Sequence, residues 1–262
     1  MTDAAPGSPS VAAPAPALRT ALRALLEADL VVQLRNVRVV ALSTVVPLVP
    51  LIALFANKRA QALGDPRFKV AFCMVLGVAT IAVLGYSMSV ARDREAGVFQ
   101  RLRVTPTPAW AIMASRLAIQ VLAILVMAVV VLVAAAAFES VRLDAGGYVL
   151  TLVAVVLAAA MFLSIGQALV GLIRSTDTLN AVSRLVYIPL FALGLLGHTD
   201  ILGTTFETIA RWSPGGAVAT MLGGAMSPTT WNGETWAAVL VVLAYAVAFA
   251  SAGIRWFRWT AS

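Results

Sequence analysis

The stretch YVLTLVAVVLAAAMFLSIGQALVGLI, residues 148–173, decides the fold class because it contains no charged residue. A transmembrane helix needs about 20 predominantly apolar residues, and this stretch is longer than that. The rest of the chain has the same character. Of its 262 residues, 61% are hydrophobic and 12% are charged, whereas soluble domains carry about 25% charged residues. The sequence therefore predicts an all-α integral membrane protein.

Five more apolar runs lie on either side of this stretch. The six predicted transmembrane helices cover approximately residues 39–56, 70–91, 109–138, 148–173, 178–197 and 236–254. The first contains Pro47 and Pro50, which favour a kink. The fifth contains Arg184, about two turns from its start. We expect one membrane domain over residues 39–258.

Two segments precede the first predicted span. Residues 1–17 consist largely of Ala, Pro, Ser and Gly, which predicts a disordered tail. In residues 18–38 the leucines recur at helical spacing, with arginines off that stripe. This pattern predicts an amphipathic interfacial helix on the membrane surface, and an ordinary packed helix is the alternative.

The distribution of basic residues predicts the orientation. The chain has 19 basic and 12 acidic residues, a net charge of +7. We attribute this excess to cytoplasmic loops and anionic lipid, and we find no module that reads nucleic acid. With the N-terminus inside, six basic residues lie outside and the other thirteen inside. Although four of the six fall in the first outer loop, the count predicts both termini in the cytoplasm and a multi-pass plasma-membrane protein.

A charged segment, RDREAGVFQRLRVTPTPAW at residues 92–110, separates the second and third predicted spans. Asp93 is a suitable N-cap, Phe99 and Leu102 share a helical face, and Pro106 disfavours helix at the residue before it. We therefore expect a short cytoplasmic helix over residues 93–104. From the residues alone, it could be a lipid-facing loop or a docking element.

The segment REAGVFQRLRVTPTPAWAIMASRL resembles the cytoplasmic segment of type-2 ABC transporter permeases. The matching positions are Glu95, Gly97, Arg101, Leu102, Arg103, Thr105, Pro106 and Arg116. Val98 departs from the family, which often has Thr there. A looser similarity lies in IARWSPGGAVATMLGGA, before the last span, where Gly215 and Gly216 replace the family's usual Leu-Thr. The resemblance is nearest to bacterial drug-export permeases of the daunorubicin-resistance type.

This resemblance implies a function and several partners. In such permeases the short helix is a coupling helix that docks on a separate ATPase. Here its residues would be Arg94, Glu95, Gly97, Phe99, Arg101, Leu102 and Arg103. The chain has no G-x-x-x-x-G-K-[ST] motif, so ATP and Mg²⁺ would be bound by a partner ATPase dimer, and this chain would need no cofactor and carry no catalytic residue. A second permease copy, identical or a sister subunit, is also implied.

Other polar residues leave open how the substrate would cross the membrane. Arg184 could line a pathway, or it could extend its charge to the membrane surface. Ser164 and Gln167 could contact substrate or form hydrogen bonds between helices. No acidic residue lies within a predicted span, which favours an amphiphilic drug or lipid-like substrate. With one Cys and one His, an intrachain disulfide is impossible and a zinc site is not expected.

The loop before the last span is predicted to contain two short re-entrant helices within residues 200–226. Ser213 and Pro214 form a helix start, and the apolar run after them is too short to cross the bilayer. We expect these helices to form an outer gate at a dimer axis, with Ala219 and Met221 facing the second copy. An interfacial hairpin that anchors the loop is the alternative.

Three other classes of protein compete with an exporter permease. A secondary transporter usually needs buried ionisable groups, for which Arg184 is a candidate. A membrane enzyme is disfavoured because the sequence lacks the H-E-x-x-H and G-x-S-x-G motifs. A membrane scaffold without transport activity is the third alternative.

Overall fold

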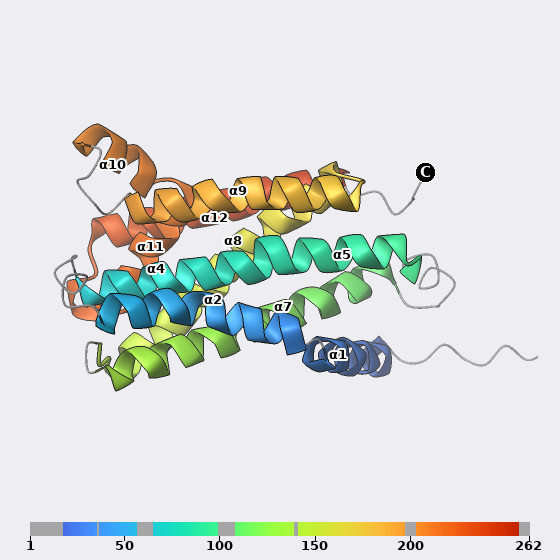
Figure 1. Ribbon diagram of the computed structural model, residues 1–262, viewed down its shortest axis with the longest axis horizontal. Helices are drawn as coiled ribbons and strands as arrows, with labels where there is room; N and C mark the ends of the chain where they lie inside the picture. The colour runs from blue at the N-terminus through green and yellow to red at the C-terminus, as the bar shows by residue number, and fades with distance from the viewer. Residues whose placement is uncertain are drawn as a thin grey trace, which may run out of the picture.

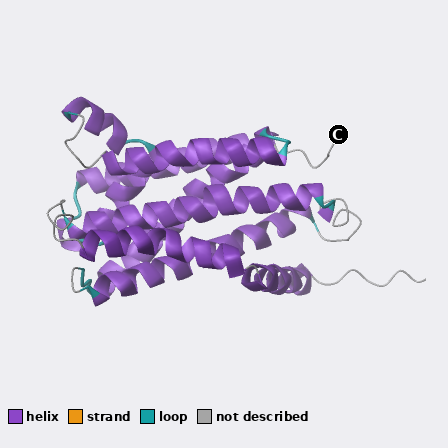
Figure 2. Cartoon of the chain, viewed as in Figure 1, coloured by secondary structure: helices purple, strands orange, loops and turns teal. Residues whose placement is uncertain are grey.

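The computed structural model describes residues 18–35, 37–56, 65–98, 108–138, 141–196 and 203–256. The regular secondary structure of these residues is helical, which confirms the all-α prediction (Figure 2). The elements are α1 (Leu18–Arg35), α2 (Val37–Ala56), α4 (Pro66–Ala79), the π-helix η1 (Thr80–Gly85), α5 (Tyr86–Glu95), α7 (Ala109–Ala137), α8 (Ala145–Leu172), α9 (Thr176–Leu196), α10 (Thr204–Arg211), α11 (Pro214–Ala225), the 3-10 helix η3 (Pro228–Thr230) and α12 (Gly233–Trp256).

Five helices in the described part of the chain are long and apolar enough to cross a membrane. One is the continuous helix formed by α4, η1 and α5, which we call span 2; the others are α7, α8, α9 and α12. The 28 residues of α8 extend about 42 Å at 1.5 Å per residue, more than the ~30 Å hydrocarbon core. Helix α2 contains a shorter apolar stretch, Ser43–Ala56, and Pro47 and Pro50 lie inside it.

Span 2 and α8 form the centre of the bundle. We compared how much of the most apolar stretch of each helix is buried by the rest of the protein. The buried share is 78% for span 2 and 61% for α8, but only 22% for α9 and 17% for α12. Helix α8 packs against α12, α7, α11 and span 2. Its lack of charge follows from this position, because an unpaired charge among apolar helices is costly.

The helices run side by side along the long axis of the molecule (Figure 1). Span 2, α8 and α12 end at the same end of the bundle, near α1. We call this the inner end, because it is the end that the sequence predicts to face the cytoplasm. The opposite end, which carries α10 and α11, is the outer end.

Span 2 extends further than the sequence predicts. The apolar pattern predicts residues 70–91, whereas the helix runs from Pro66 to Glu95. Asp93 therefore lies in the last turn of span 2, whereas we expected it to cap a separate helix. The chain turns two residues after the helix ends, where Gly97 has a φ of 67°. Glycine suits this position because it adopts positive φ at little cost.

Helix α1 lies crosswise at the inner end. Figure 1 shows it almost end-on, whereas the long helices run across the page. It contacts α7 and α2, and its side chains Val32 and Leu34 are 68% and 62% exposed. The helix thus packs on the bundle and also presents an apolar surface. It ends at Arg35, and α2 begins at Val37, slightly earlier than the predicted boundary at residue 38.

Candidate functional site

The segment between span 2 and α7 is described only at its two ends. Arg94 and Glu95 belong to the last turn of span 2, and Gly97 forms the turn that follows. The other predicted docking residues, Phe99, Arg101, Leu102 and Arg103, lie outside the described residues. The structure therefore defines the two helices that carry this segment.

An ion pair joins these two helices. The guanidinium of Arg116, on the second turn of α7, donates to the carboxylate of Asp93 at the end of span 2. The two side chains are only 14% and 30% exposed. Next to this pair, the Ser115 hydroxyl donates to the Asp29 carboxylate of α1 over 2.6 Å. The inner ends of span 2, α7 and α1 are thus connected by two polar contacts.

Sequence reasoning missed these contacts. It noted Arg116 only as a basic residue near the start of a span, and it assigned Asp93 to a helix cap. The signal that could have suggested the pair is opposite charge at the two ends of one loop, because those ends must meet when the flanking helices pack antiparallel.

Arg94 binds within the chain. Its two terminal nitrogens donate to the carbonyl oxygens of Ile173, over 3.2 Å, and Val170, over 3.0 Å. These carbonyls belong to the end of α8, where backbone acceptors have no partner within the helix and a positive charge is favourable. Arg94 thus joins span 2 to α8, and its predicted contact with a partner protein stays a prediction.

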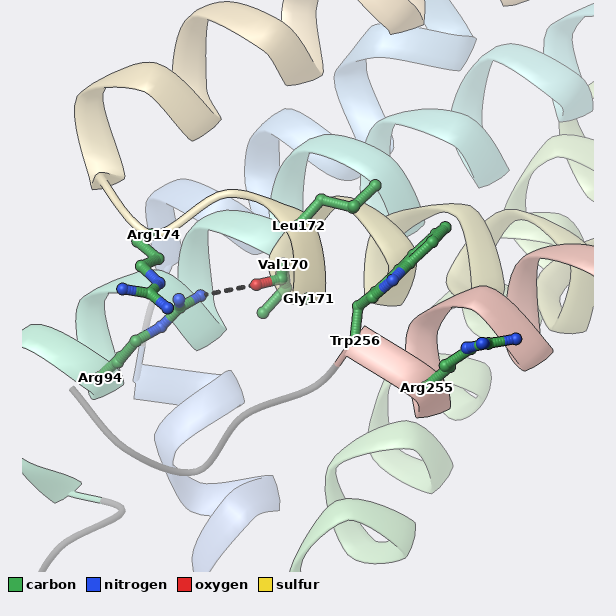
Figure 3. A pocket seen from close by; sticks show the side chains of 7 residues that line it. All are labelled: Arg94, Val170, Gly171, Leu172, Arg174, Arg255 and Trp256. Atoms are coloured by element: carbon green, nitrogen blue, oxygen red, sulfur yellow. Dashed lines mark hydrogen bonds between the residues drawn. The ribbon is translucent and has the colours of Figure 1, made fainter. Parts of the chain in front are cut away.

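A basic pocket lies beside this contact. Its cavity of about 320 Å³ is lined by Arg94, Arg174 and Arg255 together with Val170, Gly171, Leu172 and Trp256. Arg94 and Arg174 lie on one side, and Trp256 and Arg255 lie across from them (Figure 3). Arginines from span 2, the α8–α9 connection and the end of α12 therefore line one cavity, and in this view the Arg255 side chain points away from Arg94 and Arg174.

Further polar contacts join span 2 to α9 and α8, and together we call them the polar layer. The Thr80 and Tyr187 hydroxyls are 3.0 Å apart, which joins span 2 to α9. Tyr86 donates to the side-chain carbonyl of Gln167, and the Ser87 hydroxyl donates to the backbone oxygen of Gly166 over 3.3 Å. Two of these contacts join span 2 to α8, and the hydrogen bond of Gln167 fits the inter-helix alternative.

The π-helix lies within this layer. Residues Thr80–Gly85 form the turns of span 2 that face α8, and π-helical turns frequently occur at functional sites. The two helices come very close here, since a Cβ at Gly166 would lie 2.4 Å from the Ala82 carbonyl oxygen. The sequence marked Gly166 only as part of an apolar run, and nothing in it predicts the π-helix.

Ser164 and Arg184 differ in their surroundings. The Ser164 hydroxyl donates to the Met161 carbonyl of its own helix over 2.6 Å, so this contact does not join two helices. Arg184 lies on the outward face of α9, where Leu185 and Ile188 are 69% and 60% exposed. It is eight residues from the start of α9, about 12 Å at 1.5 Å per residue. Whether Arg184, Ser164 and Gln167 line one pathway stays a prediction.

The outer loop contains the two short helices that the sequence predicted, α10 and α11. Ser213 caps α11, with its side chain accepting from the Gly216 amide over 3.2 Å, and Pro214 is the first helical residue. Arg211 joins α10 to α12 by donating to Glu234 over 2.6 Å. Burial lowers the pKa of Arg211, but hydrogen bonds with Glu234 and Glu207 raise it by more, so the net pKa is above its ordinary value.

The expected position of α11 at a dimer axis does not agree with its packing. Ala219 and Met221 are 1% and 0% exposed because α11 packs among α4, α9 and α12 of the same chain. Its glycines allow this approach: a Cβ at Gly215 would lie 2.0 Å from the Leu190 carbonyl oxygen of α9, and one at Gly224 would lie 2.4 Å from Thr235 of α12. A cysteine at position 219 or 221 is therefore not expected to reach a second copy.

The described residues contain no group of three or more His, Cys, Asp or Glu side chains that could hold a metal ion. The polar contacts of this part of the chain include the inner ion pair, the polar layer and the Arg211–Glu234 pair, and each of them joins two helices.

The long apolar helices and the helix-joining contacts define the chain as a helical integral membrane protein. Residues 20–216 match the family model described as ABC-2 type transporter. Since the match covers more than half of the chain, the protein belongs to the ABC-2 type transporter family and is a membrane permease of an ABC-type transporter. Comparison with curated proteins finds no match. Permeases of this family work with ABC ATPase subunits.

Proposed function

We propose that this chain is the permease subunit of an ABC exporter that moves an amphiphilic drug or lipid-like molecule out of the cell. A separate ATPase dimer would bind ATP and Mg²⁺ and supply the energy. The observation that carries this proposal is the connection of the segment after span 2 to the rest of the bundle. Asp93 and Arg94, adjacent in sequence, bind α7 and α8 respectively.

The proposed topology has six spans with both termini in the cytoplasm. Helix α2 would be the first span, since its 20 residues, about 30 Å long, match the hydrocarbon thickness. Helix α1 would lie at the inner surface, in accordance with its crosswise position (Figure 1). The thirteen basic residues assigned to the inside support this orientation.

The proposed substrate class follows from the composition of the spans. The acidic residues in the five long helices lie near their ends: Asp93, Glu95, Asp177 and Glu234. A cationic substrate would therefore find no carboxylate deep in these helices. A mainly apolar molecule with a weakly polar group fits such a path better. A second permease copy, identical or a sister subunit, would complete the pathway.

The test uses Leu102, which the resemblance places in the ATPase pocket. In Leu102→Asp, a charge in an apolar docking pocket should cost several kcal/mol, more than a hundredfold in affinity. The ATPase should fail to copurify, or transport should stop, while the permease still reaches the membrane. Leu102→Met, which keeps an apolar side chain, should retain both. Normal transport by Leu102→Asp with the ATPase still bound would refute the docking role.

A further inference from the structure

We propose that the basic pocket at the inner end binds the phosphate of an anionic phospholipid from the adjacent leaflet. The pocket is formed by Arg94, Arg174 and Arg255, with Trp256 beside them. The proposal requires only that this end lies at a bilayer surface, and it does not depend on export or on the ATPase.

The charge of the pocket matches a phosphate. Three of its lining residues are arginines, and its described lining contains no acidic residue. Arginine is suited to phosphate because its planar guanidinium presents five N–H donors. Arg94 uses two donors on the α8 carbonyls, which fixes the guanidinium and leaves three. Its position is therefore set by the fold before any ligand binds.

The size and shape also match a small anionic group. A cavity of about 320 Å³ is at the lower end of the range for ligand pockets. Figure 3 shows the indole of Trp256 between the Arg94–Arg174 side and Arg255. Basic pockets between membrane helices on the cytoplasmic side are known binding sites for lipid head groups.

The surface next to the pocket favours a lipid over a carboxylate of a partner protein. Helix α12 is the least buried of the long helices, and Val247 and Ile254 on it are 66% and 78% exposed. At the end of the same helix, Trp256 is 48% exposed and lines the pocket. Tryptophan at the end of a span is typical of the membrane interface. Acyl chains could thus lie along α12 while the phosphate meets the arginines.

The test measures lipid binding to the full chain in mild detergent by native mass spectrometry. The probes are phosphatidylglycerol, phosphatidylcholine and glycerol 3-phosphate. The test variant is the double substitution Arg174→Gln with Arg255→Gln, and both side chains are exposed, so the core is unchanged. The control is Arg35→Gln, an exposed arginine of α1 that does not line the pocket. Arg94 is not varied because it joins span 2 to α8.

The wild type should bind phosphatidylglycerol more tightly than phosphatidylcholine. Each arginine removed should weaken phosphatidylglycerol binding about fivefold, so the double variant should lose roughly 25-fold. Its binding of phosphatidylcholine should not change, and Arg35→Gln should lose less than about twofold. Without added lipid, every variant should still unfold in one cooperative thermal transition, which shows that the fold is intact.

Three results would overturn the proposal. An equal loss in Arg35→Gln would show that surface charge in general, not this pocket, attracts the lipid. Competition by glycerol 3-phosphate at the same concentrations as phosphatidylglycerol would assign the pocket to a soluble phosphate compound. Unchanged lipid binding by the double variant, with loss of a copurifying ATPase, would assign it to the partner protein. The last two results leave the export function itself untouched.

Discussion

Removing the ion pair between Asp93 and Arg116 should loosen the inner end of span 2 from α7. The perturbation is a double-mutant cycle with Asp93→Asn, Arg116→Gln and both together. Each substitution keeps a polar side chain of similar size and removes one charge. The cycle isolates the energy of the pair from the separate effects of the two substitutions.

The expected magnitude follows from the burial of the pair. Exposed ion pairs contribute about 0.2–1 kcal/mol, whereas removing one partner of a buried pair costs about 3–5 kcal/mol. Asp93 and Arg116 are 30% and 14% exposed, which is between these cases. We therefore expect a coupling energy of about 2 kcal/mol, with each single variant destabilised and the double variant less destabilised than the sum.

The assay is unfolding of the full chain in mixed detergent micelles, followed by the loss of helical signal. The control cycle uses Arg23 and Glu27, an i,i+4 pair on α1 with side chains 83% and 64% exposed. That pair should show a much smaller coupling, because solvent screens it. If the coupling between Asp93 and Arg116 were no larger than that of the control pair, the inner ends would not be held by this contact.

Two further predictions concern packing and the polar layer. Gly215→Ala should cost about 1–3 kcal/mol, because the new methyl group would meet the Leu190 carbonyl oxygen at 2.0 Å. The control is Gly223→Ala in the same helix, where the new Cβ meets no neighbouring group within 4 Å. This variant should leave the free energy of unfolding unchanged or raise it by up to about 1 kcal/mol. Equal melting temperatures for the two variants would contradict the close packing at Gly215. Tyr86→Phe should cost about 1–3 kcal/mol, because the Gln167 carbonyl loses its donor, and an unchanged melting temperature would show that this bond contributes nothing.

The sequence predicts the parts of this fold that depend on length and local chemistry. The apolar runs fall within helices because long uncharged segments must satisfy their backbone hydrogen bonds internally in a membrane. Ser213 and Pro214 begin α11 because a cap and a proline act locally.

Contacts between distant residues could not be predicted in the same way. Arg94 meets carbonyls 76 and 79 residues away, and no local pattern marks them. The glycines of α11 indicate a close approach, but they do not specify the partner helix. The sequence analysis placed a second copy there, whereas α9 and α12 of the same chain occupy that surface.

The inner end of span 2 connects the segment after it to two other helices at once. Successive residues of a helix point about 100° apart, so Asp93 and Arg94 in one turn can reach neighbours on different sides. Asp93 holds α7, and Arg94 holds the end of α8. Through Ser115 and Asp29, α7 is in turn joined to α1. The end of span 2 is therefore attached to both α7 and α8, just before the segment predicted to dock on the ATPase. Helix α9 also packs on span 2, through the Thr80–Tyr187 pair and through the rings of Phe72 and Phe191, whose centroids are 4.9 Å apart. Span 2 is therefore the helix to which α7, α8 and α9 are all attached.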